Sequence, residues 1–312
     1  MSTDPFRLTR TGLSCAILVA AAFAAPARSA TNLEEYARSY SVSAHPDVHV
    51  RASFGFVHVT TSDSNKVEFE VKYDKTEWAS ELPIDSRQDG NLVELTALAD
   101  QRTGWGWGHW GNHRLDIEVR MPKNANLQVQ TSNGKVEVAS LNGNISLHTS
   151  NGEIRAEQLA GVIDLGSSNG ALNLTALKGT LKARTSNGAI IATGLEGKCD
   201  LSTTNGKLQA DGRFESLDLS SGNGGIVARA ESGSTMSSAW KIHTSNAGVD
   251  LTLPTDLKAT LDASTTNGGI TLDLPVTMQG YDSRRQVRGA LNGGGPELSV
   301  QTTNGGIHIR GT

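Results

Sequence analysis

The chain has 312 residues, a formal net charge of −4, 34 glycines and only 5% aromatic residues. The weakly acidic balance argues against a basic surface for nucleic acid or for an anionic membrane. Abundant glycine with few aromatic side chains argues against a thick globular core and favours many tight turns around a thin aliphatic interior. The length suits one large domain or two smaller ones.

The first 30 residues have the pattern of a secretory signal peptide. Two arginines precede a short apolar run at residues 13–25, and small residues follow as far as Ala30. The run is too short to cross a bilayer, and cleavage after Ala27 or after Ala30 fits the pattern. We therefore expect an exported protein of the periplasm, the extracellular space or the cell surface, with no transmembrane segment in the mature chain.

Residues 31–128 are β-rich but irregular. Apolar side chains alternate around Val50, Val57 and Phe69, and again at residues 91–98 and 115–121. The open end of a stack of strands is a sheet edge that invites aggregation. We therefore expect this region to cap the repeats that follow it, either as a separate domain or as irregular first coils.

Between the last two of these strands lies the segment 101–113, QRTGWGWGHWGNH. In it Trp105, Trp107, His109 and Trp110 stand among glycines, and such a loop could present aromatic faces to sugar rings. These four residues are the candidate ligand-binding site. The structural alternative is that the tryptophans fold back and plug the end of the thin core.

No metal site or cofactor is expected. His109 and His113 could meet His45 or His49, but loop histidines without a cysteine partner seldom form a specific site. The repeat turns also lack the aspartate that calcium-binding nonapeptide rolls need in every turn. Once the signal peptide is removed, Cys199 is the remaining cysteine, and its inward strand position indicates a buried small hydrophobe.

The stretch 131–226 carries a strict repeat. An Asn-Gly step returns every 18 residues, and its asparagines are Asn133, Asn151, Asn169, Asn187, Asn205 and Asn223. Alternating apolar residues and a second, glycine-marked turn give two short strands per repeat. A fixed period of this kind is typical of stacked units. We predict an all-β, single-stranded β-helix-like fold: a parallel β-solenoid with 18-residue coils over 129–312, in which the six asparagines form a structural ladder.

Two other folds have related patterns. Asn-Gly between alternating strands also signals an antiparallel meander, but a meander gives no reason to keep one residue type at one position six times. The left-handed hexapeptide helix needs an aliphatic residue at every sixth position, where this chain has Asn142 and His148. Both alternatives therefore fit the sequence less well than a parallel solenoid.

Three segments share a family motif: MPKNANLQVQTSNGKVEV at 121–138, LPTDLKATLDASTTNGGITLDLP at 253–275 and QTTNGGIHIRGT at 301–312. In these segments the chain resembles the bacterial putative-adhesin family, domains of unknown function with TSNG-type β-solenoid repeats. The resemblance covers most of the chain after about residue 45. It implies a secreted β-solenoid with no established enzymatic role.

Beyond Asn223 the interval lengthens to 23, 21 and 37 residues, with asparagines at 246, 267 and 304. The longest interval contains the Gly-rich segment 278–296, which we expect to leave the coil surface as a loop. The arginines of this segment either dock an acidic partner or are simply solvated: Arg284, Arg285 and Arg288.

Three functions fit these patterns. An exported, non-enzymatic adhesin-like binding or scaffold protein of the cell envelope, whose partner is an envelope protein or a glycan, is favoured because no recurrent acid, base or nucleophile appears. A polysaccharide-active enzyme needs clustered carboxylates, and one outward column offers them: Asp164, Lys182, Asp200 and Asp218. A structural or stress-related envelope component is the third.

Overall fold

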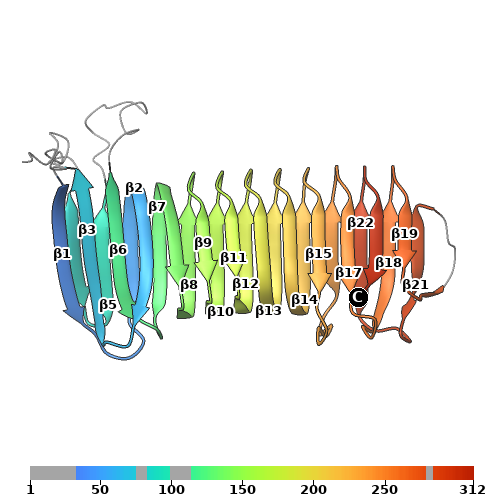
Figure 1. Ribbon diagram of the computed structural model, residues 1–312, viewed down its shortest axis with the longest axis horizontal. Coiled ribbons are helices and arrows are strands. Elements are labelled where there is room, and N and C mark those ends of the chain that lie inside the picture. Colours follow the sequence, from blue (N-terminus) through green and yellow to red (C-terminus); the bar gives the residue numbers. More distant parts are fainter. Residues whose placement is uncertain (1–32, 75–82, 99–113, 279–283) are drawn as a thin grey trace, which may run out of the picture. The chain divides into compact units, whose positions relative to one another are not determined.

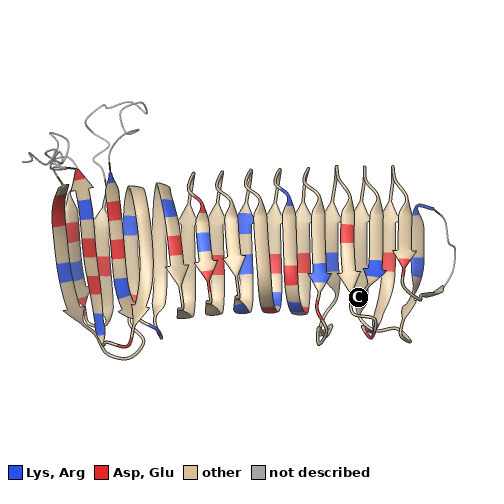
Figure 2. Ribbon diagram, in the orientation of Figure 1, with Lys and Arg blue, Asp and Glu red and all other residues tan. Residues whose placement is uncertain are grey.

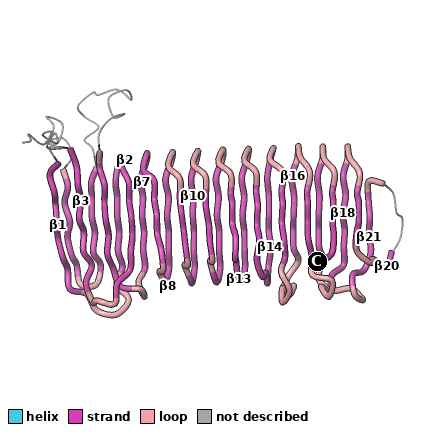
Figure 3. The backbone as a smooth tube through the Cα atoms, in the orientation of Figure 1, coloured by secondary structure: helices cyan, strands magenta, loops and turns pink. Residues whose placement is uncertain are grey.

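The computed structural model describes residues 33–74, 83–98, 114–278 and 284–312, which belong to one compact unit, Leu33–Thr312. The described residues form an all-β, solenoid-like stack of 23 strands in one hydrogen-bonded sheet, which folds into two faces (Figure 1). The strands lie side by side across the long axis of the stack (Figure 3). In these ranges no helix has the length and hydropathy of a bilayer-spanning segment.

The regular part of the stack is parallel and in register. Ile163 lies opposite Ile145 on one side and Leu181 on the other, so paired residues differ by 18 in number. Its strands are β7 (Asn126–Ala139), β8 (Asn142–Thr149), β9 (Ile154–Glu157), β10 (Ala160–Ser167), β11 (Leu172–Thr175), β12 (Lys178–Thr185), β13 (Ile190–Thr203), β14 (Leu208–Ser221) and β15 (Ile226–Ala230). Two register shifts separate β13 from β14 at their second turns, because β14 has one residue fewer than β13 before Gly212 and one more after Phe214.

The alternation of side chains decides which face of each strand is buried. In β10, Ile163 and Leu165 are buried while Val162 is exposed and Asp164 is half-buried. A third apolar position lies within the second turn, as at Leu159, and all these positions join a single hydrophobic core cluster along the stack. Each coil therefore buries its aliphatic side chains against the coils above and below it.

The second turns at residues 140–143, 158–161, 176–179 and 194–197 each contain two residues in the left-handed region. One of the two is a glycine, such as Gly161 at φ 119°, for which this conformation is easy. The other lies three positions earlier, as Gln158 does at φ 54°. The equivalent positions in neighbouring coils are also left-handed: Ser140, Ala176 and Gly194. Three of these four positions therefore carry a side chain in a conformation that favours glycine.

Replacement of Ala176 by Gly should stabilise the protein. Its φ of 55° costs an L-residue about 1–2 kcal/mol, and glycine removes that cost but loses about 0.5–1 kcal/mol through the added backbone entropy of the unfolded chain. We expect a net gain of about 0.5–1 kcal/mol in the free energy of unfolding, measured by urea denaturation. Ala171→Gly is the control, because Ala171 has ordinary φ and should lose about the same amount. A shift of the same sign for both variants would contradict the assigned turn.

The N-terminal strands continue the stack. They are β1 (Leu33–Ser41), β2 (Asp47–Ser62), β3 (Lys66–Asp74), β4 (Ile84–Asp89), β5 (Leu92–Ala97) and β6 (Leu115–Pro122). The two halves of β2 pair in parallel with β7 on one side and with β5 and β6 on the other. The region 31–128 therefore contributes parallel layers of its own, and the predicted boundary at residue 128 falls inside β7.

Antiparallel strands close the N-terminal end. Strand β4 pairs with β5, β3 pairs with β6, and β1 pairs with β3. The hydroxyls of Tyr36 and Tyr40 lie 2.7 and 2.6 Å from the Ser86 hydroxyl on β4, and Tyr40 packs edge-on against Phe69. These contacts tie the two edge strands together over the end of the core.

The C-terminal coils do not follow sequence order. Their strands are β16 (Trp240–Thr244), β17 (Val249–Leu253), β18 (Ala259–Thr265), β19 (Ile270–Asp273), β20 (Thr277–Met278), β21 (Gln286–Leu291), β22 (Glu297–Thr302) and β23 (Ile307–Gly311). Strand β22 lies between β16 and β18, and β23 lies between β17 and β19, all in parallel. The last coil of the chain is thus inserted between two earlier coils.

The segment 278–296 differs from the loop that its composition predicts. Residues 286–291 form β21, which pairs antiparallel with β18 and with the two residues of β20. The reason is burial, because Val287 and Leu291 of β21 pack on the hydrophobic core. Residues 284–285 and 292–296 of the segment lie outside strands, as a loop would. Residues 279–283 lie outside the described part of the chain.

Candidate binding surfaces

An amide ladder runs along the edge formed by the Asn-Gly turns. Each asparagine Nδ2 donates to the Oδ1 of the asparagine in the neighbouring coil at 2.6–2.8 Å, in the order Asn133, Asn151, Asn169, Asn187, Asn205, Asn223, Asn246, Asn304 and Asn267. These side chains are exposed. One N–H of each linked amide is therefore used within the ladder, and the other faces solvent.

A second row of hydrogen bonds lies beneath the ladder. The buried Thr149 hydroxyl donates to the Gly134 carbonyl at 3.0 Å in the previous coil and accepts from the Gly152 N–H at 3.1 Å. Its counterparts donate in the same way: Ser167, Thr185, Thr203, Ser221, Thr244, Thr302 and Thr265. From Thr149 onward, the Thr or Ser two residues before each asparagine therefore joins neighbouring coils. The equivalent Thr131 hydroxyl, before Asn133, is buried without a hydrogen-bond partner.

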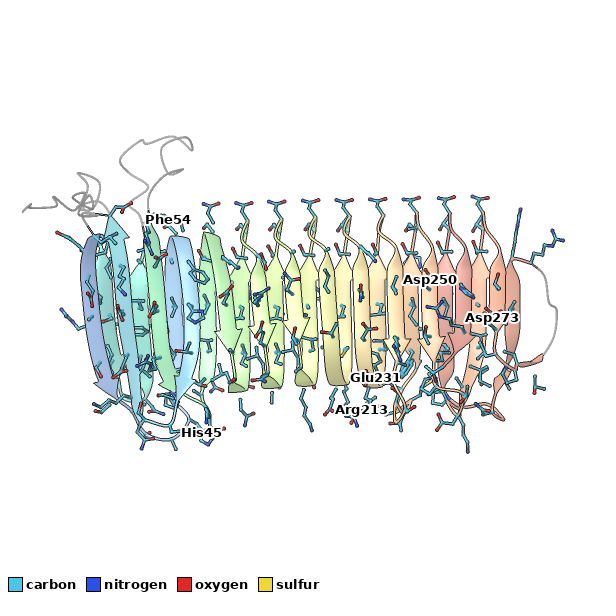
Figure 4. All side chains as sticks on the ribbon, viewed as in Figure 1. His45, Phe54, Arg213, Glu231, Asp250 and Asp273 are labelled. Atoms are coloured by element: carbon cyan, nitrogen blue, oxygen red, sulfur yellow. The ribbon has the colours of Figure 1, made fainter. Side chains whose placement is uncertain are left out.

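Phe54 ends the ladder at the N-terminal side. It pairs with Asn133 in the β2–β7 register and is 6% exposed, with Gly55 opposite Gly134 (Figure 4). The sequence Ser53-Phe54-Gly55 thus occupies the place of a Ser-Asn-Gly turn. The aromatic ring replaces the amide, so the run of hydrogen-bonded asparagines stops there.

The two strands on either side of the tryptophan-rich segment meet this edge. Trp105, Trp107, His109 and Trp110 lie outside the described residues, but the strands on either side are placed. Strand β5 ends at Ala97 and β6 begins at Leu115, and both pair with β2 around its Phe54 turn. The segment therefore connects β5 to β6 where the neighbouring layers have a short Asn-Gly or Phe-Gly turn.

A shallow groove of about 350 Å³ crosses the outer face of β1, β3 and β6. Glutamates converge there with Arg38 and Arg120: Glu35, Glu68, Glu70 and Glu118. Bands of acidic and basic residues alternate over these strands in Figure 2. A hydrogen bond to Glu70 raises the pKa of the neighbouring Lys72 ammonium. The groove is open to solvent, and two of its glutamates are paired, Glu68 with Arg120 and Glu70 with Lys72.

The charged column suggested by the sequence is in register. Asp164, Lys182, Asp200 and Asp218 lie opposite one another on consecutive strands, and Arg184 binds the Asp200 carboxylate at 2.9 Å. Partial burial, and next the charge of Asp200, raises the pKa of the Asp218 carboxyl. These carboxylates line neither the groove on β1, β3 and β6 nor a second groove beside the turns of β12, β13 and β14. The column lies on an open sheet face.

Another shallow groove, about 410 Å³, lies beside the second turns of β12, β13 and β14. Glu196 forms ion pairs there with Lys178 at 3.1 Å and with Arg213 at 2.5 Å. The hydrogen bond from Lys178 is the main reason that the pKa of the Glu196 carboxyl is lowered. Arg213 and Glu231 lie near each other at this edge in Figure 4.

The candidate metal-binding histidines and Cys199 remain to be placed. His45 is exposed, and His49 lies 3.7 Å from Glu94, while His109 and His113 lie outside the described residues. Among the described residues no group of three or more His, Cys, Asp or Glu is arranged to hold a metal ion. Cys199 is buried, and burial raises the pKa of its thiol to about 12, so it is a poor nucleophile.

The arginines after residue 283 do not form a cluster of free cations. Arg288 on β21 is bound to the Asp262 carboxylate at 3.0 Å, on the neighbouring strand β18. Arg284 is exposed and its backbone carbonyl accepts from Ile270 N–H at 3.0 Å. The pairing of Arg288 removes one of the three charges that an acidic partner would meet.

A family profile described as Toastrack DUF4097 matches residues 43–310. The chain belongs to this Toastrack family. The match begins before β2 and ends in β23, so it includes the N-terminal parallel layers and the inserted C-terminal coil. Comparison with curated protein sequences gives no match.

Solved structures similar to this Toastrack chain include three bacterial proteins. A putative adhesin from Bacteroides fragilis has 11% identity and a TM-score of 0.41, covering 89% of this chain and 97% of its own. A putative lipid binding protein from Parabacteroides distasonis has 12% identity and 0.37, covering 88% and 96%. A putative cell adhesion protein from Clostridium sporogenes has 11% and 0.28, covering 90% and 100%. These values are too low to transfer a function.

Proposed function

We propose that the protein is an exported, non-enzymatic, adhesin-like binding or scaffold protein of the cell envelope. The pattern of residues 1–30 supports export to the periplasm or the cell surface. The 18-residue coil supplies a long, hydrogen-bonded support along which the partner, an envelope protein or a glycan, is held. Residues 31–128 cap this support at its N-terminal side.

One observation carries the proposal: the β5–β6 connection replaces a short turn with a long segment that contains Trp105, Trp107, His109 and Trp110. Its two ends are held by β5 and β6, which are paired on both flanks in the part of the chain described. Binding residues are often carried by loops on such rigid supports. Tryptophan side chains offer large aromatic area against sugar rings or apolar protein surfaces.

The test is binding by the full chain with all three tryptophans of the segment changed to Ala. We expect the wild type to retain glycans on an array, or an envelope protein in co-purification. The variant should bind about 30-fold more weakly, since aromatic anchors contribute about 2 kcal/mol or more. The matched control is the triple Trp→Phe change, which keeps aromatic faces and should bind more tightly than the Ala variant.

Two results would contradict the proposal. The Ala variant and the wild type could bind equally well, in which case the segment is not the binding site. Alternatively, the wild type could cleave a polyuronate and lose that turnover in Asp200→Asn. The second result would instead support the enzymatic alternative on the column of Asp200 and Asp218, whose strands are paired in register.

A further inference from the structure

The Asn-Gly steps that mark the coils are chemically labile. In such a step the glycine nitrogen loses its proton to base and attacks the asparagine Cγ, and ammonia leaves. Water then opens the succinimide to aspartate or isoaspartate, so the reaction consumes water and releases ammonia without any other reactant. Glycine favours the attack because it has no Cβ to hinder its nitrogen. The asparagines of these steps have the numbers 133, 142, 151, 169, 187, 205, 223, 267, 292 and 304.

Two sets of hydrogen bonds oppose this reaction in the inner coils. The Gly188 N–H donates to the Thr185 hydroxyl at 3.2 Å, which holds the attacking nitrogen. The Asn187 amide donates to Asn169 at 2.7 Å and accepts from Asn205 at 2.6 Å, which holds the group under attack. These bonds have to break before the succinimide ring can close. The same glycine hydrogen bond is present at four other turns: Gly152, Gly170, Gly206 and Gly224.

The Asn267-Gly268 step, at the C-terminal end of the ladder, lacks most of these bonds. The Asn267 amide donates to Asn304 at 2.8 Å, but its Oδ1 accepts no hydrogen bond from the described residues. The Thr265 hydroxyl donates to the Gly305 carbonyl at 2.8 Å, yet the Gly268 N–H has no hydrogen-bond partner in the described part of the chain. Residues 267–269 are all exposed, so water and base reach both reacting groups.

The other Asn-Gly steps outside the inner coils are more constrained. The Asn304 amide is bound on both sides within the ladder, at 2.8 Å each. The Asn292 amide donates to two backbone carbonyls, also at 2.8 Å each. The glycines that follow Asn133 and Asn142 lie inside strands β7 and β8. Asn267 is therefore the asparagine with the fewest restraints on the reaction.

We propose that Asn267 is a site of spontaneous deamidation, and that the amide ladder and the Thr and Ser hydroxyls beneath it protect the inner Asn-Gly steps. A carboxylate at position 267 cannot donate to the Asn304 Oδ1 and places a negative charge beside that oxygen. Isoaspartate also puts its Cβ into the main chain. We expect hydrogen exchange of the deamidated protein to show less protection in β19, with β10 unchanged.

The first test uses the wild-type chain and compares two identical local sequences. Residues 265–270 and 302–307 are both TTNGGI, so Asn267 and Asn304 have the same immediate neighbours in the chain. The folded protein is incubated in mildly alkaline buffer, and mass spectrometry of its peptides follows the conversion of each amide to acid. We expect Asn267 to react about fivefold faster than Asn304, because one hydrogen bond fewer holds its amide. It should react about twentyfold or more faster than Asn187.

The same chain unfolded in urea is the control. There Asn267 and Asn304 should react at equal rates, because only the fold distinguishes them. Asn267→Gln should remove the fast reaction, since a glutamine side chain closes the ring far more slowly. Equal rates in the folded protein, or an inner asparagine that reacts first, would overturn the proposal.

The second test removes one protecting bond from an inner coil. Thr185→Val takes away the acceptor of the Gly188 N–H, and deamidation of Asn187 should become about fivefold faster. Thr185→Ser is the matched control, because it keeps the hydroxyl that Ser167 and Ser221 supply at equivalent turns. This control should leave the rate at Asn187 unchanged. No acceleration in Thr185→Val, or equal acceleration in both variants, would contradict the protective role of the hydroxyl row.

Discussion

Replacement of Ile163 by Asp should unfold several coils. The Ile163 side chain is 1% exposed and lies between Ile145 and Leu181 of the neighbouring coils. A carboxylate there has no partner, and an unpaired buried charge is among the few changes that cost more than about 4–5 kcal/mol. We expect loss of the cooperative transition, or a fall of that size in the free energy of unfolding, measured by circular dichroism in urea.

The adjacent residue supplies the control. Val162 is 56% exposed and faces solvent between Asn144 and Thr180. Val162→Asp introduces the same charge one residue away, and should cost about 1 kcal/mol or less, through strand propensity alone. Equal losses for the two variants would mean that the inward and outward sides of β10 are assigned wrongly.

Replacement of Gly188 by Ala is the second large effect. A Cβ atom on Gly188 would lie 1.9 Å from the Gly170 carbonyl oxygen of the previous coil. The backbones of the two turns would have to move apart, which breaks the adjoining hydrogen bonds of Thr185 and Asn187. We expect a loss of about 3 kcal/mol or more in the free energy of unfolding.

Hydrogen exchange should locate this damage. The amides of β12 and β13 near the altered turn should lose protection before those of β2 and β7, because coils interact mainly with their neighbours. Gly269→Ala is the control, since a Cβ there meets nothing within 4 Å, and it should stay within about 0.5 kcal/mol of wild type. A tolerated Gly188→Ala would show that the turns do not stack closely.

The regular coils could be predicted from the sequence because one residue type marks each of them. The asparagines from Asn133 to Asn223 are evenly spaced, and the all-β, solenoid-like architecture follows from that period. The hydrophobic positions of β10 and β12 also follow, since alternation alone decides which side chains face inward. The role of the Thr and Ser row was missed, although its spacing before each asparagine was visible.

The N-terminal layers could not be predicted at this level. Strand β2 lies in register with β7, yet the paired residues Phe54 and Asn133 are 79 positions apart and chemically different. The inserted β3 to β6 separate the two coils along the chain, so no fixed period connects them. The Phe-Gly step at Gly55, which lies opposite Gly134, was the available signal.

The order of the C-terminal coils was hidden for a different reason. In the sequence, intervals of 23, 21 and 37 residues suggest a repeat that decays, whereas in space the ladder passes from Asn246 to Asn304 and then to Asn267. The identical TTNGGI segments were a visible hint that residues 302–307 belong beside 265–270. Which layer is inserted depends on pairing along both edges, and local patterns do not determine that.

The candidate binding residues are predicted only from the local composition of the sequence and from their position between two strands. The sequence singles out Trp105, Trp107, His109 and Trp110 because tryptophans and glycines cluster there. The structure adds the placement of the flanking strands, β5 ending at Ala97 and β6 beginning at Leu115.

A crystal structure of the mature chain tests the central claim most directly, namely that equivalent residues of successive coils lie on one another. We expect Asn151 within hydrogen-bond distance of both Asn133 and Asn169, and Asn304 between Asn246 and Asn267. Electron density that places Asn151 away from both neighbours, or Asn304 at the end of the ladder, would contradict the stacked architecture described above.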